Sequence, residues 1–458
     1  MIHLSLTKLA EVFALDQQYM PSLEFRGVTI DSRKSCENQL FVAIRGERFD
    51  GHDYVEAAYQ AGAVAALVET KLDCDIPQFI VADCKRAMIQ LANYWRHQCQ
   101  ATVIALTGSN GKTTVKEMLF QLLQKQGQTH ATQGNFNNDI GVPLTLFALS
   151  EDDVYAVIEM GANHKGEIAV LANIAEPDIV YVNNVAAAHL AGFGSVQGVI
   201  EAKGELYAYC QKQHRAIFNI DEIASQQWRQ CCAAENQLSC SLDINQQADI
   251  RANWQATETG LRLSVSYKGQ TESVELKVFG EHNARNALAA ISIAISAEVD
   301  FRAAVQNLSG FSGVDGRLQM LEGPANSRLI NDSYNANPTS LEAGMKVLCS
   351  LKGVAWLALG DMGELGDDAE VFHQQAARKA LELGVEKFFA IGLMSCQASQ
   401  TFADQGYCFE SIGDMAMIIR AQIHEDVNLL IKGSRSAGME KLVEMLISQN
   451  QSEVRHAL

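Results

Sequence analysis

The chain has 458 residues, of which 48% are hydrophobic, and this length suits about three domains of the usual ~150 residues. Its formal net charge of −18 disfavours nucleic acid as a partner, although a local lysine can still bind an anionic ligand. No apolar run approaches the ~18 residues of a membrane span, so none is expected. The 11 scattered cysteines include no Cys-X-X-Cys pair, and no signal peptide is evident, so reduced thiols in a cytoplasmic protein are predicted.

Residues 1–84 are predicted to form a small α/β domain. A helix is expected near Tyr54–Ala61. The triplet Asp31-Ser32-Arg33 follows the first predicted strand and, by residue type alone, is typical of a capped turn. The apolar runs that predict strands are Val28–Ile30, Leu40–Ile44 and Ala65–Val68.

Residues 85–313 are predicted to form a second domain around a glycine-rich turn, Thr107-Gly108-Ser109-Asn110-Gly111-Lys112-Thr113-Thr114. The turn joins a predicted buried strand, Val103–Leu106, to a predicted helix. Glycines let backbone N–H groups surround phosphate oxygens, Lys112 can reach the terminal phosphates, and the Thr113 hydroxyl can hold magnesium. The general phosphate-loop pattern requires glycine where this chain has Leu106, so an ordinary strand-to-helix turn stays open. The glycine, lysine and threonine residues of this turn favour an ATP-binding loop over an ordinary turn.

Further along the second domain, two candidate metal ligands follow predicted strands. Glu159 ends one strand, and His189 lies in a short loop after the strand Ile179–Val182. A carboxylate and an imidazole suit a Mg²⁺ site if phosphate and water supply the other ligands, although a lone histidine is more often structural. Lys203 begins a helix and, taken alone, is typical of an exposed surface lysine.

The rest of the chain continues the α/β pattern. Residues Asp249–Phe279 partly alternate polar and apolar side chains and predict a hairpin, and a helix is expected from about Asn283 to Ala297. Residues 314–458 are predicted to form a third domain, Rossmann-like and doubly wound, with ligands near the carboxyl ends of its strands. Its apolar runs, each followed closely by glycine, are Val354–Leu359, Phe388–Ile391 and Leu429–Ile431.

Taken together, these segments resemble the Mur ligase family, the ATP-dependent amino-acid-adding enzymes of peptidoglycan synthesis. Thr107–Thr113 matches the family's TGxNGKT loop, in which leucine before the threonine is normal. The resemblance spans most of the chain. The other matching segments are Asp31–Arg33, Gly134–Asp139, Glu159–His164, Asn184–Leu190, Glu281–Asn286, Gly316-Arg317, Asn331–Pro338 and Gly360–Gly366.

The resemblance implies a role for each candidate in the second domain. Lys112 and Thr113 would bind the ATP phosphates and a magnesium ion. Glu159 and His189 would ligate magnesium between ATP and the acyl substrate, in a site for two such ions. Lys203 matches the family lysine that is carbamylated by CO₂, which converts a cation into an anionic oxygen ligand.

The resemblance also implies contacts with the nucleotide and the substrates. Asn283 and Asn286 would contact adenine, while Arg317 and Asp332 would contact the nucleotide from the third domain. Asp31-Ser32-Arg33 lies where the family's first domain holds the UDP-sugar substrate. The remaining implied substrate contacts are Asn135, Asn138, Tyr334 and Asn335.

Within the family, the third domain favours the enzyme that adds D-alanyl-D-alanine to a UDP-N-acetylmuramoyl-tripeptide. The ligase that adds the third residue usually has Tyr-Ala-His-Thr-Pro where this chain has Tyr334-Asn335-Ala336-Asn337-Pro338, and its Asp-Asn-Pro-Arg motif is absent here. Lys432 and Arg435 are candidates to hold a substrate carboxylate, with a solvated loop as the alternative. A monomer is expected, and the third-position diamino acid is not predicted.

Two other functions fit part of this set of residues. Folylpolyglutamate synthetase shares the phosphate loop and architecture, but the first domain with Asp31-Ser32-Arg33 disfavours it. A nucleotide-binding regulatory module would bind ATP yet release no phosphate with any amino acceptor. The presence of Glu159, His189 and Lys203 disfavours that alternative.

Overall fold

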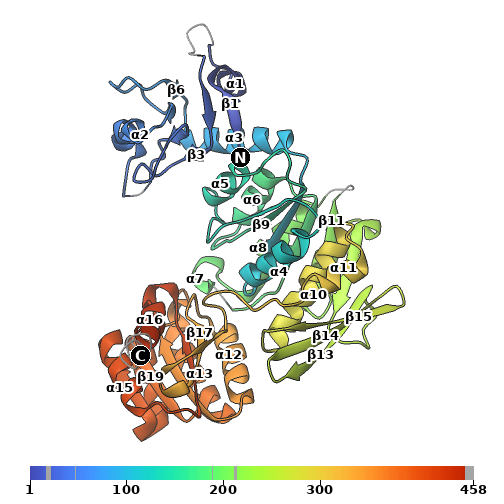
Figure 1. Ribbon diagram of the computed structural model, residues 1–458, viewed down its shortest axis with the longest axis vertical. Coiled ribbons are helices and arrows are strands. Elements are labelled where there is room, and N and C mark those ends of the chain that lie inside the picture. Colours follow the sequence, from blue (N-terminus) through green and yellow to red (C-terminus); the bar gives the residue numbers. More distant parts are fainter. Residues whose placement is uncertain (17–21, 47, 188, 211–213, 449–458) are drawn as a thin grey trace, which may run out of the picture.

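The computed structural model describes residues 1–16, 22–46, 48–187, 189–210 and 214–448. Three α/β domains follow one another along the chain, with the central domain between the other two (Figure 1). The α/β class with three domains, predicted above, is confirmed. The exact boundaries at residues 84 and 313 stay a prediction. No helix in the described part of the chain is long and apolar enough to cross a membrane.

The N-terminal domain is built on a parallel sheet of order β3-β4-β5-β6. Strand β5 is buried at every position, as expected for a strand covered on both faces. A second, two-stranded antiparallel sheet pairs β1 with β2. The elements are β1 His3–Ser5, α1 Leu6–Val12, β2 Glu24–Arg26, β3 Val28–Thr29, β4 Leu40–Val42, α2 Val55–Gln60, β5 Ala65–Val68, β6 Gln78–Ile80 and α3 Cys84–Gln98.

The central domain contains a nine-stranded sheet of order β15-β14-β13-β12-β11-β10-β7-β9-β8. Neighbours from β8 to β13 are parallel, whereas β13, β14 and β15 are antiparallel. The predicted hairpin is therefore a three-stranded meander, because the third strand lies within the segment that was expected to hold two. The strands are β7 Thr102–Thr107, β8 Thr129–Ala131, β9 Tyr155–Glu159, β10 Ile179–Val182, β11 Arg215–Asn219, β12 Gln237–Ser241, β13 Ile250–Thr257, β14 Gly260–Tyr267 and β15 Gln270–Leu276.

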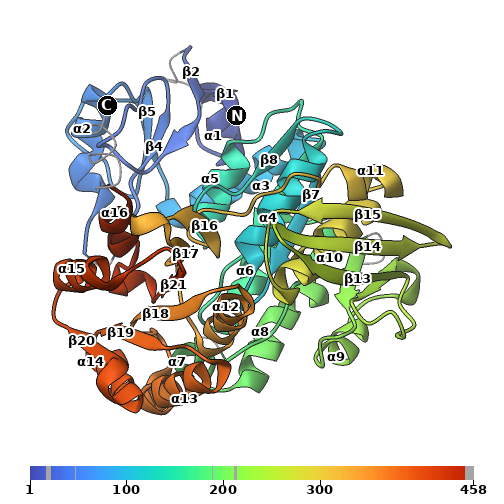
Figure 2. The ribbon, with the colours of Figure 1, turned by 60° about the horizontal axis from the view of Figure 1, so that its bottom comes forward.

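Helices cover both faces of this sheet (Figure 2). Successive side chains of β7 point to opposite faces, so Val103 and Ala105 join one apolar core and Ile104 and Leu106 join the other. Helices α4 and α10 pack in the second core, and α3, α5, α6 and α8 pack in the first. The helices are α4 Lys112–Leu123, α5 Gly141–Phe147, α6 Glu167–Ala175, α7 Leu190–Phe193, α8 Val196–Ala208, α9 Ser225–Arg229, α10 Glu281–Ser296 and α11 Phe301–Gln306.

The C-terminal domain is doubly wound, as predicted. Its six-stranded sheet has the order β16-β17-β21-β18-β19-β20, and only β16 runs antiparallel to its neighbour. Helices α12, α13 and α14 contribute to the core on one face, and α15 and α16 to the core on the other. The elements are β16 Gln319–Glu322, β17 Arg328–Asp332, α12 Pro338–Ser350, β18 Val354–Gly360, α13 Ala369–Leu383, β19 Lys387–Ile391, α14 Leu393–Ser399, β20 Gly406–Phe409, α15 Ile412–Gln422, β21 Val427–Lys432 and α16 Glu440–Ser448.

One prediction about the cysteines is wrong. Cys396 on α14 and Cys408 on β20 form a disulfide, so the thiols are not all reduced. The pairing follows from the fold, because α14 and β20 are neighbours in the C-terminal domain although their cysteines lie 12 residues apart. Nine other cysteines in the described part of the chain form no disulfide.

A tyrosine of α8 provides a test of the central sheet. The Tyr207 hydroxyl accepts a hydrogen bond from the Val182 N–H at 3.0 Å and donates one to the Ile217 carbonyl at 2.6 Å. These bonds join the end of β10 to the middle of β11. Tyr207→Phe leaves both buried backbone groups without this partner, so we expect a loss of about 1–3 kcal/mol in the free energy of unfolding. Urea denaturation measures it, with the exposed Tyr59→Phe as control. Equal midpoints for the two variants would contradict the assignment.

Candidate active site

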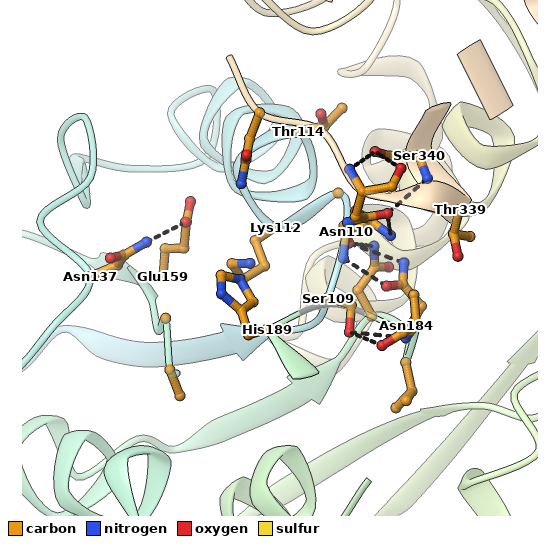
Figure 3. Close-up of a pocket in the computed structure, with 18 of the residues that line it drawn as sticks. Ser109, Asn110, Lys112, Thr114, Asn137, Glu159, Asn184, His189, Thr339 and Ser340 are labelled. Atoms are coloured by element: carbon orange, nitrogen blue, oxygen red, sulfur yellow. Dashed lines mark hydrogen bonds between the residues drawn. The ribbon is translucent and has the colours of Figure 1, made fainter. Parts of the chain in front are cut away.

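A cavity of about 1210 Å³ lies between the central and C-terminal domains. Its lining comes from loops at the carboxyl ends of β7, β9 and β10, from the start of α10, and from β17, α12 and the end of β21. Ligands of open α/β sheets bind at this edge, where strands end and loops diverge. Figure 3 shows the phosphate loop, Glu159 and His189 in this cavity.

The phosphate loop is held by side-chain amides from other segments. The Asn110 N–H donates to the Asn184 Oδ1 at 2.8 Å, and the Asn110 carbonyl accepts from the side chains of Asn183 and Asn184 at 2.9 and 3.0 Å. Gly111 has a φ of +79°, and a Cβ there would lie 2.5 Å from both Asn183 Nδ2 and Asn286 Oδ1. Only glycine fits this position.

Asn183 and Asn184 were not among the predicted site residues. Both directly follow β10, and two adjacent amides at the end of a predicted strand are the signal that could have found them. Asn286 accepts from Asn183 Nδ2 at 2.9 Å and donates to Asn283 Oδ1 at 3.2 Å. The predicted adenine-binding pair therefore lies at the phosphate loop and lines the cavity, while its contact with adenine stays a prediction.

Lys112 is the first residue of α4. Its Nζ donates to the Gly108 carbonyl at 2.8 Å. Burial lowers the pKa of Lys112, the negative charge of Glu159 opposes this shift, and Arg317 adds to it. The cavity lining includes Thr114, whereas the Thr113 hydroxyl accepts a hydrogen bond from Arg317 Nη2 at 3.4 Å.

Glu159 presents one carboxylate oxygen that has no hydrogen-bond partner in the described structure. The residue is 2% exposed, and its Oε1 accepts from Asn137 Nδ2 at 2.9 Å. Its Oε2 is buried and unpaired. A buried anionic oxygen without a partner carries a large desolvation cost, which a bound cation would offset. The described residues contain no group of three His, Cys, Asp or Glu side chains that could hold a metal, so phosphate or water would have to supply further ligands.

His189 faces the third domain. It has a left-handed backbone, with φ at +53°, and its Nδ1 contacts the carboxylate of Glu364. Burial lowers the pKa of His189, with Glu364 opposing and Lys112 and Lys203 adding to the shift. The neutral imidazole favoured by these effects is the form that binds a metal.

Lys203 is not the exposed surface lysine that its residue type alone suggests. It is 2% exposed, and its Nζ lies 5.7 Å from the centre of the Phe193 ring. Burial, together with the positive charge of Lys112, lowers the pKa of Lys203 to about 7. A large fraction of the amine is therefore neutral near pH 7, which is the form that reacts with CO₂.

The third domain contributes paired charges to the cavity. Lys432 is 2% exposed, its Nζ contacts the Asp332 carboxylate, and it donates to the Asn335 carbonyl at 3.0 Å. The guanidinium carbon of Arg317 lies 4.0 Å from the centre of the Tyr334 ring, and that of Arg435 lies 5.8 Å from it. Asp332 and the Asn335 carbonyl occupy the buried Lys432 ammonium, whereas the Arg435 side chain is 68% exposed and pairs with Glu440 at 3.6 Å. Arg435 is therefore the more accessible of the two predicted cations.

Three further predicted substrate-binding residues lie in two separate parts of the molecule. Asn135 and Asn138 line the cavity, and Asn138 Oδ1 accepts from the Gly141 N–H at 2.8 Å. Asp31 lies in the N-terminal domain, in a turn where its carboxylate accepts from the Arg33 N–H at 3.1 Å and from Arg33 Nε at 2.8 Å. The Arg33 side chain holds the pKa of Asp31 at about 2. The capped turn is confirmed, and UDP-sugar binding by Asp31-Ser32-Arg33 stays a prediction.

His282 is a cavity residue that sequence reasoning did not single out. It lies in the first turn of α10, and its Nε2 is buried without a hydrogen-bond partner in the described structure. Burial lowers the pKa of His282 to about 4, with Asp332 opposing and Lys432 adding to the shift. The sequence signal that could have identified His282 as a site residue is its position beside Asn283 in the segment Glu281–Asn286.

The chain belongs to the Mur ligase family. Residues 24–105 match the Mur ligase family catalytic domain, residues 106–294 the Mur ligase middle domain, and residues 316–435 the Mur ligase glutamate ligase domain. These three matches follow one another over most of the chain.

Individual relatives match over nearly their whole length. UDP-N-acetylmuramoyl-tripeptide–D-alanyl-D-alanine ligase of Escherichia coli is 38% identical over 448 residues, which are 97% of this chain and 99% of that protein. The protein of the same name from Haemophilus influenzae is 34% identical and covers the same shares of each chain, 97% and 99%. A crystal structure of MurF from Acinetobacter baumannii has a TM-score of 0.90 at 33% identity and covers 98% of this chain and 99% of that chain.

The burial of Lys203 predicts a pH dependence of stability. The pKa is about 7 in the folded chain, against 10.5 ordinarily, so the unfolded chain binds more protons between these values. The contribution of Lys203 to stability therefore rises as pH rises through this window. We expect Lys203→Met to be more stable than the parent at pH 7, by on the order of a few kcal/mol, and to lose this advantage towards pH 10. Urea denaturation in CO₂-free buffer at both pH values measures the difference. Parallel pH profiles would contradict the prediction.

Proposed function

We propose that this chain is the ATP-dependent ligase that joins D-alanyl-D-alanine to UDP-N-acetylmuramoyl-tripeptide. The observation that carries the proposal is one cavity that brings together Lys112 of the phosphate loop, the unpaired oxygen of Glu159, and Arg317 of the third domain. The relatives that bear this enzyme's name align over nearly the whole chain and support the choice of substrates. Peptidoglycan precursor synthesis in the cytoplasm is the process to which this reaction belongs.

The reaction begins with activation of a poor electrophile. The terminal carboxylate of the tripeptide attacks the γ-phosphorus of ATP, and the bond from that phosphorus to the bridging oxygen breaks to release ADP. The resulting acyl phosphate has a good leaving group. The amine of D-alanyl-D-alanine then attacks the acyl carbon, passes through a tetrahedral intermediate and expels inorganic phosphate. Lys112 and Arg317 supply positive charge where the transferred phosphoryl group carries its negative charge.

The nucleotide is bound from two domains. The backbone N–H groups of Gly111 and the first turn of α4 suit phosphate oxygens, because the helix N-terminus carries partial positive charge. Those of Ser109 and Asn110 already donate to Asn184. Thr113 and Thr114 follow in the first turn of α4. Beside the phosphate loop, Asn283 and Asn286 of the central domain bind adenine. From the third domain, Arg317 and Asp332 bind the rest of the nucleotide.

Two magnesium ions complete the site in this proposal. Thr113, Glu159, His189 and carbamylated Lys203 would hold them, and the unpaired Oε2 of Glu159 and the lowered pKa of His189 fit a cation. When bound, the ions supply charge neutralisation at the phosphates. The Lys203 carbamate is proposed because its amine is buried and has a pKa of about 7.

The two substrates reach the cavity from different domains. Asp31-Ser32-Arg33 of the N-terminal domain binds the UDP-sugar end of the donor, and Asn135 and Asn138 border its peptide end in the cavity. Tyr334, Asn335, Lys432 and Arg435 lie on the third-domain side, where the acceptor binds. Arg435 holds the acceptor carboxylate with two parallel hydrogen bonds. The enzyme acts as a monomer.

A panel of donors and acceptors tests the proposed substrates. Phosphate release should require ATP, a UDP-N-acetylmuramoyl-tripeptide and D-alanyl-D-alanine together. Single amino acids should serve poorly, because a lone residue lacks the second peptide unit that positions its amine. Equal activity with free meso-diaminopimelate and a UDP-N-acetylmuramoyl-dipeptide would assign the chain to the preceding step instead. Binding of ATP without phosphate release in any combination would favour a regulatory module.

The carbamate at Lys203 has its own test. Lys203→Ala should lose ligation, and a small carboxylic acid added to the assay should restore part of it, because the acid supplies the missing anionic oxygen. Lys112→Ala is the matched control. It should also lose ligation while folding normally, but the acid should not restore it, since an anion cannot replace a cation. A fully active Lys203→Ala enzyme, or equal rescue of both variants, would contradict the assignment.

A further inference from the structure

A second lysine of α4 is buried but has no part in the reaction proposed above. Lys116 lies one helical turn after Lys112, and its side chain is 3% exposed. Lysine is almost never buried to this degree unless a partner compensates its charge. Lysines at positions i and i+4 lie on one face of a helix, so Lys116 lies below Lys112 on α4.

The contacts of Lys116 connect α4 to the end of β8. Its Nζ donates to the Thr132 carbonyl at 2.6 Å and forms an ion pair with Glu117 at 2.8 Å. The Glu117 side chain is 38% exposed, so it meets the lysine at the border of the core. The bond to Thr132 is buried, and it attaches the helix of the phosphate loop to the residue that directly follows β8.

Thr132 in turn holds Glu159. Thr132 is 1% exposed, and its N–H donates to the Val157 carbonyl at 3.0 Å. Its hydroxyl oxygen accepts from the Glu159 N–H at 3.0 Å. A single residue therefore bonds to Lys116 through its carbonyl and to the backbone of Glu159 through its hydroxyl.

The same connection continues to the Glu159 carboxylate. The chain runs from Thr132 into the loop that carries Asn137, whose Nδ2 donates to Glu159 Oε1 at 2.9 Å. The Asn137 carbonyl accepts from the Gly161 N–H at 2.8 Å. These bonds leave Oε2 as the one carboxylate oxygen of Glu159 without a partner in the described structure.

We propose that Lys116 is a positioning residue, which acts through Thr132 to hold the Glu159 carboxylate at a set distance from Lys112. The inference rests on the proposed function, in which Glu159 Oε2 binds a divalent cation beside the ATP phosphates. Hydrogen-bond partners of a metal ligand commonly change metal affinity or activity by about 10- to 100-fold when they are removed. Lys116 acts in the same way but one residue further from the cation. It orients Thr132, and Thr132 orients the metal ligand Glu159.

Lys116→Met tests the proposal, since methionine keeps the apolar stem and loses the donor. We measure binding of a nonhydrolysable ATP analogue by calorimetry, once with Mg²⁺ and once with EDTA. The Mg²⁺-dependent gain in affinity should fall about tenfold in Lys116→Met, while affinity in EDTA stays within about twofold of the parent. In the ligation assay, the Mg²⁺ concentration for half-maximal activity should rise and the KM for D-alanyl-D-alanine should not change.

Lys125→Met is the matched control, because Lys125 also donates to a backbone carbonyl, that of Asn307 at 2.8 Å, but lies at an exposed position. It should leave the Mg²⁺-dependent gain unchanged. If Lys116→Met does not fold, the Mg²⁺-dependent gain in affinity is measured on Thr132→Val instead. This substitution removes the hydroxyl that accepts from the Glu159 N–H, so it should also reduce the Mg²⁺-dependent gain. Thr132→Ser keeps the hydroxyl and should retain the gain.

Two results would overturn the proposal, and they are distinguishable. A parent protein that shows no Mg²⁺-dependent gain would refute the proposed function and this inference together. The other result is a parent protein that shows the Mg²⁺-dependent gain in affinity and a folded Lys116→Met or Thr132→Val variant whose gain lies within about twofold of it. This result would refute the positioning role alone.

Discussion

The register between adjacent parallel strands is the constraint on which the site depends. Strand β7 pairs with β9 so that Leu106 lies opposite Glu159, and with β10 so that Thr107 lies opposite Val182. The phosphate loop therefore begins where Glu159 ends its strand and where Asn183 follows the other. A one-residue slip would reverse the face of every side chain in a strand, so the buried apolar cores on both faces of the sheet preserve this register.

Several charges in the cavity are buried close to one another, and the balance among them sets their protonation. Lys112 lowers the pKa of Lys203 and of His189, while Glu159 opposes the effect of burial on Lys112. Because protein surrounds these groups on most sides, these interactions are stronger than they would be at the surface. The result is a Lys203 amine with a pKa of about 7 and a His189 imidazole whose pKa is lowered, next to one carboxylate oxygen that lacks a partner in the described structure.

Polar contacts join the third domain to the central domain. Asn337 Nδ2 donates to Asn110 Oδ1 at 2.7 Å, Arg317 bonds to Thr113, and Glu364 contacts His189. Hydrogen bonds of this kind contribute only about 0.5–1.5 kcal/mol each, because water competes for the same groups. Interfaces between domains that rest on contacts of this kind permit relative domain motion.

The amino-acid sequence by itself determined the class of fold, the phosphate loop with Lys112 between a strand and a helix, and the placement of Glu159 at a strand end. Apolar periodicity and glycine–lysine patterns are local, so the sequence alone carries them. Only the tertiary structure decided which strands are neighbours. It buried Lys203 and Lys116, paired Lys432 with Asp332, placed Asn183 and Asn184 behind the phosphate loop, and joined Cys396 to Cys408. Burial and partnership depend on which segments the fold brings together, and local sequence patterns specify neither the partner of a side chain nor its burial.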